Sequence, residues 1–343
     1  MNQPGFIREA PATMPPWAEG WSEKPRIRSV LCGVDLSEFS YRAFRHAAAL
    51  ARRFGAQLFV QHVIEPPKQA AWSAAGGMVQ ERLRGARRIA EEELRTLEAE
   101  ADTEDLNITY VLNDGDPKAR ILDTLARRRI DLLVLGTHAR KGARRLLEGS
   151  LSERLVREAT CPVLVLSQPA RELVEEEDTQ AVRVGTILIA TDFSRNSDRA
   201  VTCGLRWAAE WSSRVIFLHV VETGPPLAGI ARLLPESDPG LEGRIRDAWE
   251  KLRMLVPETA QLSRSIEYEV RAGDPREQIL GCAADQKADL IVMGSRGLGR
   301  LPIALRIGPA LSSSFASLSG GTTTAGVIRD GRYPVLAIRH LGV

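Results

Sequence analysis

Short runs of apolar residues recur along both halves of the chain. Most of them lack the alternation of polar and apolar positions that a strand with one solvent-facing side shows. Strands that are buried on both faces have this pattern, and it is typical of parallel sheets covered by helices. The pattern predicts strands at 30–34, 58–63, 108–112, 132–135 and 163–166 in the first half, and at 187–190, 215–221, 266–270, 290–293 and 335–338 in the second.

Helical patterns separate these runs. After the first run, Ala43, Ala47, Leu50 and Phe54 fall on one face of a helix. Each third run is followed by Gly-Asp-Pro, and an aspartate followed by proline suits the N-cap and first position of a helix. A charged helix is also expected after the second run of each half, from about 78 to 101 and at 241–256. Strands that alternate with helices predict an α/β fold with a parallel sheet covered on both faces.

Four features return in the same order at a nearly constant spacing. Asp35 follows the first apolar run, and Asp192 follows the corresponding run 157 positions later. The His-Val pair of the second run also returns after 157 positions. The Gly-Asp-Pro motif and the aspartate before the fourth run both return after 158 positions. This repetition indicates two copies of one ancestral domain in tandem.

The spacing then changes near the end of the second copy. Cys161 and Tyr333, which precede the last apolar runs, are 172 positions apart instead of 158, so the second copy carries 14 additional residues. Alignment from the C-terminal side places this insertion near 303–320, whereas alignment from the other side leaves the placement open. The predicted organisation is an extended proline-rich segment at 1–26, a domain at 27–167, a polar linker at 168–183 and a second domain at 184–343.

Ligands of open parallel sheets bind beyond the carboxyl ends of the strands, where the strand order reverses. Three pieces of each copy are expected at that edge: the aspartate after the first strand, the turn after the second strand, and the glycine-containing loop after the fourth. Glycines let backbone N–H groups approach a phosphate, and a helix N-terminus favours an anion. The candidate residues are Asp35, Val63, Gly136, Gly149 and Ser150 in the first copy, and Asp192, Val220, Gly294, Gly321 and Thr322 in the second.

The loop from Gly136 to Ser150, followed by Leu151-Ser-Glu-Arg-Leu-Val and Cys161-Pro-Val-Leu, resembles the motif of the universal stress protein family. The ATP-binding members of that family have Gly-x2-Gly-x9-Gly-Ser/Thr in this loop. The resemblance covers about 27–167 and 184–340. It implies two flavodoxin-like, Rossmann-like domains, each with a five-stranded parallel sheet, which pair through their last strands as an internal pseudo-dimer.

The resemblance also implies a nucleotide site in each copy. Gly136, Gly149 and Ser150 would hold phosphates, and Asp35 would face the adenosine. Ala139 departs from the pattern, because it stands where the family has its second glycine, and a positive φ there would cost about 1 kcal/mol or more. In the second copy Gly294 and Gly297 match, but the insertion displaces Gly321 and Thr322 in the sequence.

Several of these residues also have purely structural interpretations. Asp35 and Asp192, with the serines that follow them, are suited to capping the next helix. The arginines and lysine at 140–145 are more typical of a solvated face than of a phosphate site. His62 and His219 end apolar strands and are interpreted as structural groups. The five histidines lack metal-binding spacing, and the four cysteines lack a C-x-x-C pair, which favours reduced, buried thiols.

Composition narrows the possible partners. Lys and Arg number 46 and Asp and Glu number 44, giving a net charge of +2, which offers no electrostatic reason to expect a nucleic acid or an acidic membrane. The first residues lack the apolar core of a secretory signal, and no stretch is apolar enough for a membrane helix. We therefore expect a cytoplasmic protein with no nucleic acid and no membrane as partner.

The leading functional hypothesis is a stress-response regulator that binds adenine nucleotide in one or both copies. The expected cofactor is ATP, with or without Mg²⁺, and the expected partners are unidentified proteins; homodimerisation is left open. The chain lacks a Walker-type motif and an evident general base, so we expect no enzyme, or at most a slow ATPase. One alternative is a nucleotide-free scaffold with vestigial pockets. The other is an adenylating or pyrophosphate-releasing enzyme, disfavoured because the turn after the first strand has no glycine.

Overall fold

The structure is a computed structural model that describes residues 23–66, 76–100, 103–137, 151–167, 173–174, 181–223, 240–256, 265–295 and 323–339. Strands and helices alternate in both copies, as the apolar runs predict. The first copy consists of β1 (Ser29–Val34), α1 (Glu38–Phe54), β2 (Gln57–Ile64), α2 (Gly76–Glu100), β3 (Ile108–Asp114), α3 (Pro117–Arg128), β4 (Leu132–Thr137), α4 (Leu151–Glu158) and β5 (Val163–Ser167).

The second copy repeats this order. Its elements are β6 (Thr186–Ala190), α5 (Arg195–Trp211), β7 (Arg214–Glu222), α6 (Leu241–Met254), β8 (Ile266–Gly273), α8 (Pro275–Asp285), β9 (Leu290–Gly294), α10 (Thr323–Asp330) and β10 (Val335–Ile338). The expected helix positions are confirmed, including both helices that follow Gly-Asp-Pro. The insertion near 303–320 and most of the N-terminal segment, residues 1–22, lie outside the described residues.

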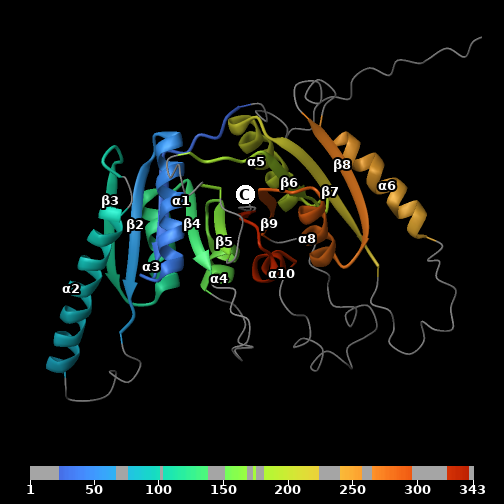
Figure 1. Ribbon diagram of the computed structural model, residues 1–343. Coiled ribbons are helices and arrows are strands. Elements are labelled where there is room, and N and C mark those ends of the chain that lie inside the picture. Colours follow the sequence, from blue (N-terminus) through green and yellow to red (C-terminus); the bar gives the residue numbers. More distant parts are fainter. Residues whose placement is uncertain are drawn as a thin grey trace, which may run out of the picture.

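The ten strands of the described residues form one sheet in the order β3-β2-β1-β4-β5-β10-β9-β6-β7-β8. Within each copy the strands are parallel, and the two copies join where β5 pairs with β10 in antiparallel orientation. Leu336 lies opposite Leu164 in this pair. Figure 1 shows the copies side by side, the first in blue to green and the second in yellow to red, with β5 and β10 at the centre. The predicted internal pseudo-dimer is confirmed.

The turns that start the helices are built alike in the two copies. Asp116 accepts a hydrogen bond from the N–H of Ala119 (2.8 Å), and Asp274 does so from Glu277 (3.0 Å), so both aspartates are N-caps as predicted. Leu36 and Phe193 occupy equivalent positions after β1 and β6, with φ values of 60° and 58°. A non-glycine residue in this region is uncommon and marks a constrained turn. The repeat therefore preserves backbone conformation as well as sequence.

A hydrophobic core lies on each face of the sheet. One includes residues of α1, α2, α5 and α6, and the other includes residues of α3, α4, α8 and α10. Leu173 and Val174, in the segment expected to be a polar linker, are each 1% exposed and belong to the first core. The N–H of Leu173 donates to Nε2 of the buried His46 (3.2 Å). The linker is therefore partly integrated into the core, which the acidic residues around 175–178 concealed.

Helices α1 and α5 also meet across the pseudo-dyad. Phe54 of α1 packs edge-on against Trp211 of α5, with ring centroids 5.8 Å apart. Arg53 forms a 2.6 Å ion pair with Glu210, whose side chain is only 8% exposed. Aromatic pairs of this geometry add to the stabilisation from buried area. The two copies are thus held together by helix contacts in addition to the β5–β10 pair.

Candidate functional site

The strand order reverses once in each copy, so the molecule has two equivalent sites at the carboxyl ends of its strands. In the first copy the chain runs from β1 to β2 and β3 on one side and then returns to β4 on the other side of β1. The order reverses in the same way between β6 and β9. Such reversals open a crevice at the carboxyl ends of the strands. Asp35 follows β1 and Asp192 follows β6, so the structure brings both predicted aspartates to these edges.

Asp35 is exposed and is held by the turn that follows it. Its Oδ1 accepts hydrogen bonds from the backbone N–H (3.1 Å) and the hydroxyl (2.5 Å) of Ser37. The Ser37 hydroxyl oxygen in turn accepts from the N–H of Ser40 as the N-cap of α1 (3.3 Å). Ser37, and not Asp35, is therefore the helix cap. Asp35 orients the capping serine while its carboxylate lies at the carboxyl edge.

The corresponding turn of the second copy is more buried, and the side chain of Thr191 adds two hydrogen bonds to it. Ser194 caps α5 and donates its N–H to Oδ1 of the half-buried Asp192 (3.0 Å). Thr191, which stands where the first copy has Val34, accepts from the N–H of Phe193 (3.1 Å) and donates to the Ser197 hydroxyl (3.0 Å). The second turn is therefore fixed more tightly than the first.

The two strand-end histidines are structural, as predicted. Nδ1 of His62 lies 2.9 Å from the carbonyl oxygen of Val34, and Nδ1 of His219 lies 2.9 Å from that of Thr191. Both bonds tie the second strand of a copy to its first strand. The ring of His219 also stacks on Phe193, with centroids 4.4 Å apart. Burial lowers the pKa of His219 below the usual 6.5, although the carbonyl contact opposes this.

Val63 and Val220, the other predicted residues at this edge, follow the histidines directly. Successive side chains of a strand point to opposite faces of the sheet. The valines therefore face away from the histidines, and Val220 packs against the core under α3, α4, α8 and α10. Val63 pairs in register with Asn113 of β3 and is half-buried. Each copy thus has a half-buried valine near the carboxyl end of the strand that pairs with the aspartate-bearing strand.

Packing constrains the glycines that end the fourth strand of each copy, more tightly at Gly136 than at Gly294. A Cβ atom at Gly136 would lie 2.8 Å from the carbonyl oxygen of Phe39, at the start of α1. At Gly294 the nearest atoms belong to Asn196 of α5 and lie 3.3 Å away. Neither glycine has a positive φ. Close approach of helix and strand explains both residues, and the sequence, read for phosphate binding, did not reveal this role.

The remaining predicted residues of the phosphate loops are Ala139, Gly149, Ser150, Gly297, Gly321 and Thr322, and they lie outside the described residues. The helices that follow the two loops are described, and they begin directly after Ser150 and Thr322. In the second copy Thr324 of α10 donates its hydroxyl to the carbonyl oxygen of Gly294 (2.7 Å). The start of α10 is therefore anchored to the carboxyl end of β9.

Sequence reasoning missed two polar residues at this end of β9. Thr324 follows the Gly-Thr pair of the family motif, and its own position carries no separate signal in the sequence. Ser295 directly follows Gly294, is 1% exposed, and its Oγ has no hydrogen-bond partner within the described part of the chain. The Gly-Ser pair is a signal for Ser295 in the sequence, because it ends an apolar run where a buried strand reaches the edge.

The cysteines are free thiols in the structure, as expected. Burial raises the pKa of Cys161, Cys203 and Cys282 to about 12, so these thiols are protonated at neutral pH and poor nucleophiles. Within the described ranges, no group of three or more His, Cys, Asp or Glu side chains is arranged to hold a metal ion. A search of the same residues finds no helix with the length and hydropathy of a membrane span.

These features define the class of the protein: two doubly wound α/β domains in tandem, joined through their last strands, each with an aspartate at its carboxyl edge. The family model described as "Universal stress protein family" matches residues 26–167 and 184–339. The chain therefore belongs to the universal stress protein family.

Individual relatives agree with this assignment. A universal stress protein of Methanocaldococcus jannaschii is 26% identical over 151 residues, covering 42% of this chain and 85% of the relative. One from Thermus aquaticus is 32% identical over 154 residues, covering 45% of this chain and 98% of the relative. The crystal structure of a universal stress protein from Archaeoglobus fulgidus has a TM-score of 0.57 at 19% identity and covers 91% of this chain and 96% of its own. Because the identity is only 19%, the likeness to the Archaeoglobus fulgidus structure concerns the fold alone.

Proposed function

We propose that the protein is a cytoplasmic stress-response regulator that binds adenine nucleotide, with ATP as the expected ligand, at one or both carboxyl edges. The observation that carries this proposal is the repeated arrangement of a strand-end aspartate, an apolar residue on the neighbouring strand and a helix N-terminus. Asp35 and Asp192 supply the carboxylates, and Val63 and Val220 the apolar side chains.

Each component of this arrangement suits one part of a nucleotide. A carboxylate accepts hydrogen bonds from a ribose hydroxyl or an adenine amine, and a valine offers apolar surface to the base. The N-termini of α4 and α10 present backbone N–H groups and a partial positive charge, which favour phosphate. The buried Ser295 hydroxyl, at the end of β9, adds a polar group to the second edge.

Binding without fast chemistry is the activity that these residues support. The strand-end aspartates are engaged by the N–H groups of Ser37 and Ser194, and the histidines are tied to backbone carbonyls. Phosphoryl transfer requires positioned charge and a group that orients the attacking nucleophile. We therefore propose a regulator that hydrolyses ATP slowly or not at all, with Mg²⁺ bound, if at all, through the phosphates.

Titration of nucleotide-free protein with ATP and Mg²⁺ tests this proposal. Asp35→Ala and Asp192→Ala should each weaken binding at their own edge by about tenfold to a hundredfold, because a hydrogen bond to a charged group is worth about 1.5–3 kcal/mol. Asp116→Ala is the matched control. It removes an aspartate that caps α3 after β3. Because β3 lies two strands away from β1, where the strand order reverses, this change should leave the affinity for ATP unchanged. No binding at millimolar ATP would refute the proposal.

The packing role of the glycines favours a second candidate, a nucleotide-free scaffold. Gly136 is explained by the start of α1 without any ligand, so its presence does not require a working site. The scaffold hypothesis predicts that Gly149→Val and Gly321→Val leave stress resistance in cells unchanged. Loss of resistance in either variant, with the protein still folded, would favour the nucleotide-binding regulator.

A further inference from the structure

Helix α3 ends in three consecutive exposed arginines, Arg127, Arg128 and Arg129. Exposed Arg28 lies beside them, because the hydroxyl of the next residue, Ser29, donates to the carbonyl oxygen of Arg129 (3.1 Å). We call these four residues the arginine cluster. The cluster lies at the amino end of β4, at the opposite edge of the sheet from the candidate nucleotide site.

Nearby acidic groups neutralise little of this charge. Arg127 pairs with Asp123 (2.7 Å), but both side chains are well exposed, at 78% and 44%, and such pairs contribute little. Asp131 accepts from the backbone N–H groups of Arg28 (2.8 Å) and Ser29 (3.1 Å), so its carboxylate is engaged by the chain itself. The guanidinium of Arg128 lies over the ring of Phe59, 5.2 Å from its centroid. Within the described residues, Arg28, Arg128 and Arg129 have no ion pair.

The second copy shows that the fold does not need these arginines. At the positions that correspond to the arginine cluster it has Gly185, Asp285, Gln286 and Lys287. The backbone is the same, since Arg129 and Lys287 have φ values of 50° and 53°. Basic residues stabilise a helix C-terminus by about 0.3–1 kcal/mol. That effect does not require three arginines, because α8 has no basic residue in its last turn.

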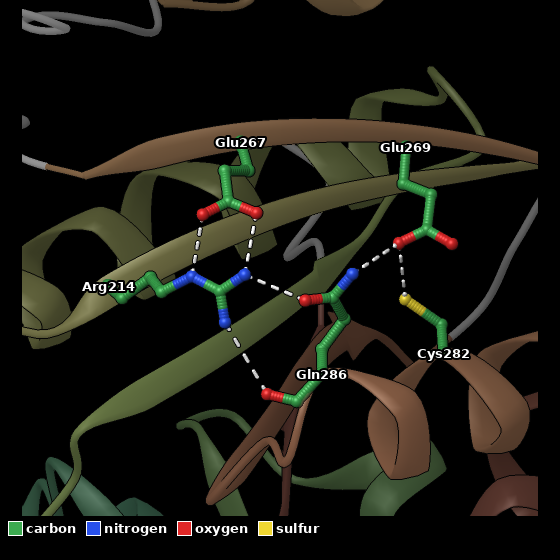
Figure 2. A network of polar contacts seen from close by, with 5 residues as sticks. All are labelled: Arg214, Glu267, Glu269, Cys282 and Gln286. Atoms are coloured by element: carbon green, nitrogen blue, oxygen red, sulfur yellow. Dashed lines mark hydrogen bonds and ion pairs between the residues drawn. The ribbon is translucent and has the colours of Figure 1, made fainter.

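The charges of the second copy are also neutralised internally at this place (Figure 2). Arg214 forms two hydrogen bonds with Glu267 (2.7 and 2.6 Å) and a third with the side chain of Gln286 (2.7 Å). Arg271, two residues after Glu269 on β8, pairs with Glu269 (2.5 Å) and Asp285 (2.8 Å). The first copy has Thr109 and Val111 at the positions of these two glutamates. It also has Gln57 and Asn113 at the positions of Arg214 and Arg271, so this network of arginines and acids is absent from the first copy as a whole.

We propose that the arginine cluster docks an acidic segment, a short run of Asp and Glu residues, of a partner protein. Charge complementarity identifies the occupant, since exposed guanidinium groups bind carboxylates with two parallel hydrogen bonds. The cluster consists of one helix end and the neighbouring Arg28 and is flanked by Asp123, in a chain whose net charge is only +2. An extended phosphodiester backbone requires a longer basic track, so an acidic peptide fits better than a nucleic acid.

A fluorescent octaglutamate peptide, titrated against the full chain, tests the proposal. Binding should weaken as the salt rises from about 20 to about 300 mM, because exposed charges are screened over shorter distances. The triple variant Arg127→Asp/Arg128→Gln/Arg129→Lys installs the residues of the second copy, and it should bind at least about tenfold more weakly. The matched control Arg82→Asp/Arg88→Gln makes the same change of charge on exposed positions of α2 and should bind as the wild type does.

Four outcomes would overturn the proposal. The first is equal affinity of the triple variant and the wild type for the peptide, and the second is an equal loss of affinity in the control variant. The third is tighter binding of a single-stranded octanucleotide than of the peptide. The fourth is salt-sensitive self-association of the wild type that the triple variant lacks. The last would assign the cluster to a second copy of this chain, whose acidic run at 175–178 has the same chemistry. If the triple variant unfolds, Arg28→Gly/Arg128→Gln, again with residues of the second copy, replaces it with the same expectation.

Discussion

At the centre of the sheet the two copies match closely, with Leu164 of β5 opposite Leu336 of β10, whereas at its two ends they differ. The outer strand β3 carries Thr109 and Val111 where the outer strand β8 carries Glu267 and Glu269. The centre must satisfy both copies at once, because each leucine packs against the other domain. The ends face no such requirement, so charge could diverge there while the backbone stayed the same.

In similarity between the two copies, the carboxyl edges are intermediate between the central strands and the outer strands. Both keep the aspartate, the constrained residue after it and the capping serine. They differ in Thr191, which ties down the turn of the second copy where the first has Val34, and in the stacking of Phe193 on His219. Both copies therefore have the same arrangement of residues at this edge, but the turn after β6 is held by more contacts than the turn after β1. Different affinities at the two edges would follow directly.

The largest effect is expected at the centre. Leu164→Ala and Leu336→Ala should each lower the free energy of unfolding by about 2–5 kcal/mol, because both side chains are fully buried and leave a cavity. The two values should agree closely, since each residue lies opposite the other. Chemical denaturation measures both, and a large difference between them would contradict equivalence at the pseudo-dyad.

An intermediate effect should distinguish the two carboxyl edges. At Gly136 a new Cβ would lie 2.8 Å from a backbone oxygen, which forces a shift, and overpacking of this kind costs about 1–3 kcal/mol. At Gly294 the contact is 3.3 Å, so Gly294→Ala should cost less than Gly136→Ala. Thermal unfolding of both variants checks the order. The opposite order would show that α5 approaches its strand more closely than α1 does.

The sequence predicted most of the fold, for identifiable reasons. The apolar runs located every strand, and Asp116-Pro117 and Asp274-Pro275 located two helix starts, because strand burial and N-caps are local signals. It did not reveal the packing role of Gly136, since the atom that excludes a side chain there, the oxygen of Phe39, is remote in sequence. The burial of Leu173 depends on contacts with α1 and was hidden for the same reason.

The smallest effect concerns pH and the second copy. The pKa of His219 is lowered by burial, so the unfolded chain binds a proton more readily than the folded one. Stability should therefore be fully present above pH 6.5, the ordinary value, and should fall as the pH drops from there through the folded pKa. His219→Gln should reduce this dependence. Denaturation midpoints between pH 5 and pH 8 measure it, and an unchanged slope in the variant would exclude His219 as the cause.

The central claim is that the carboxyl edges hold adenine nucleotide, and analysis of the purified protein tests it most directly. The protein is denatured, its small molecules are extracted, and any nucleotide is identified and counted per chain. The account predicts adenine nucleotide in the wild type and none in the double variant Asp35→Ala/Asp192→Ala. Wild-type protein that releases no nucleotide, and takes up none on subsequent titration with millimolar ATP, would contradict it.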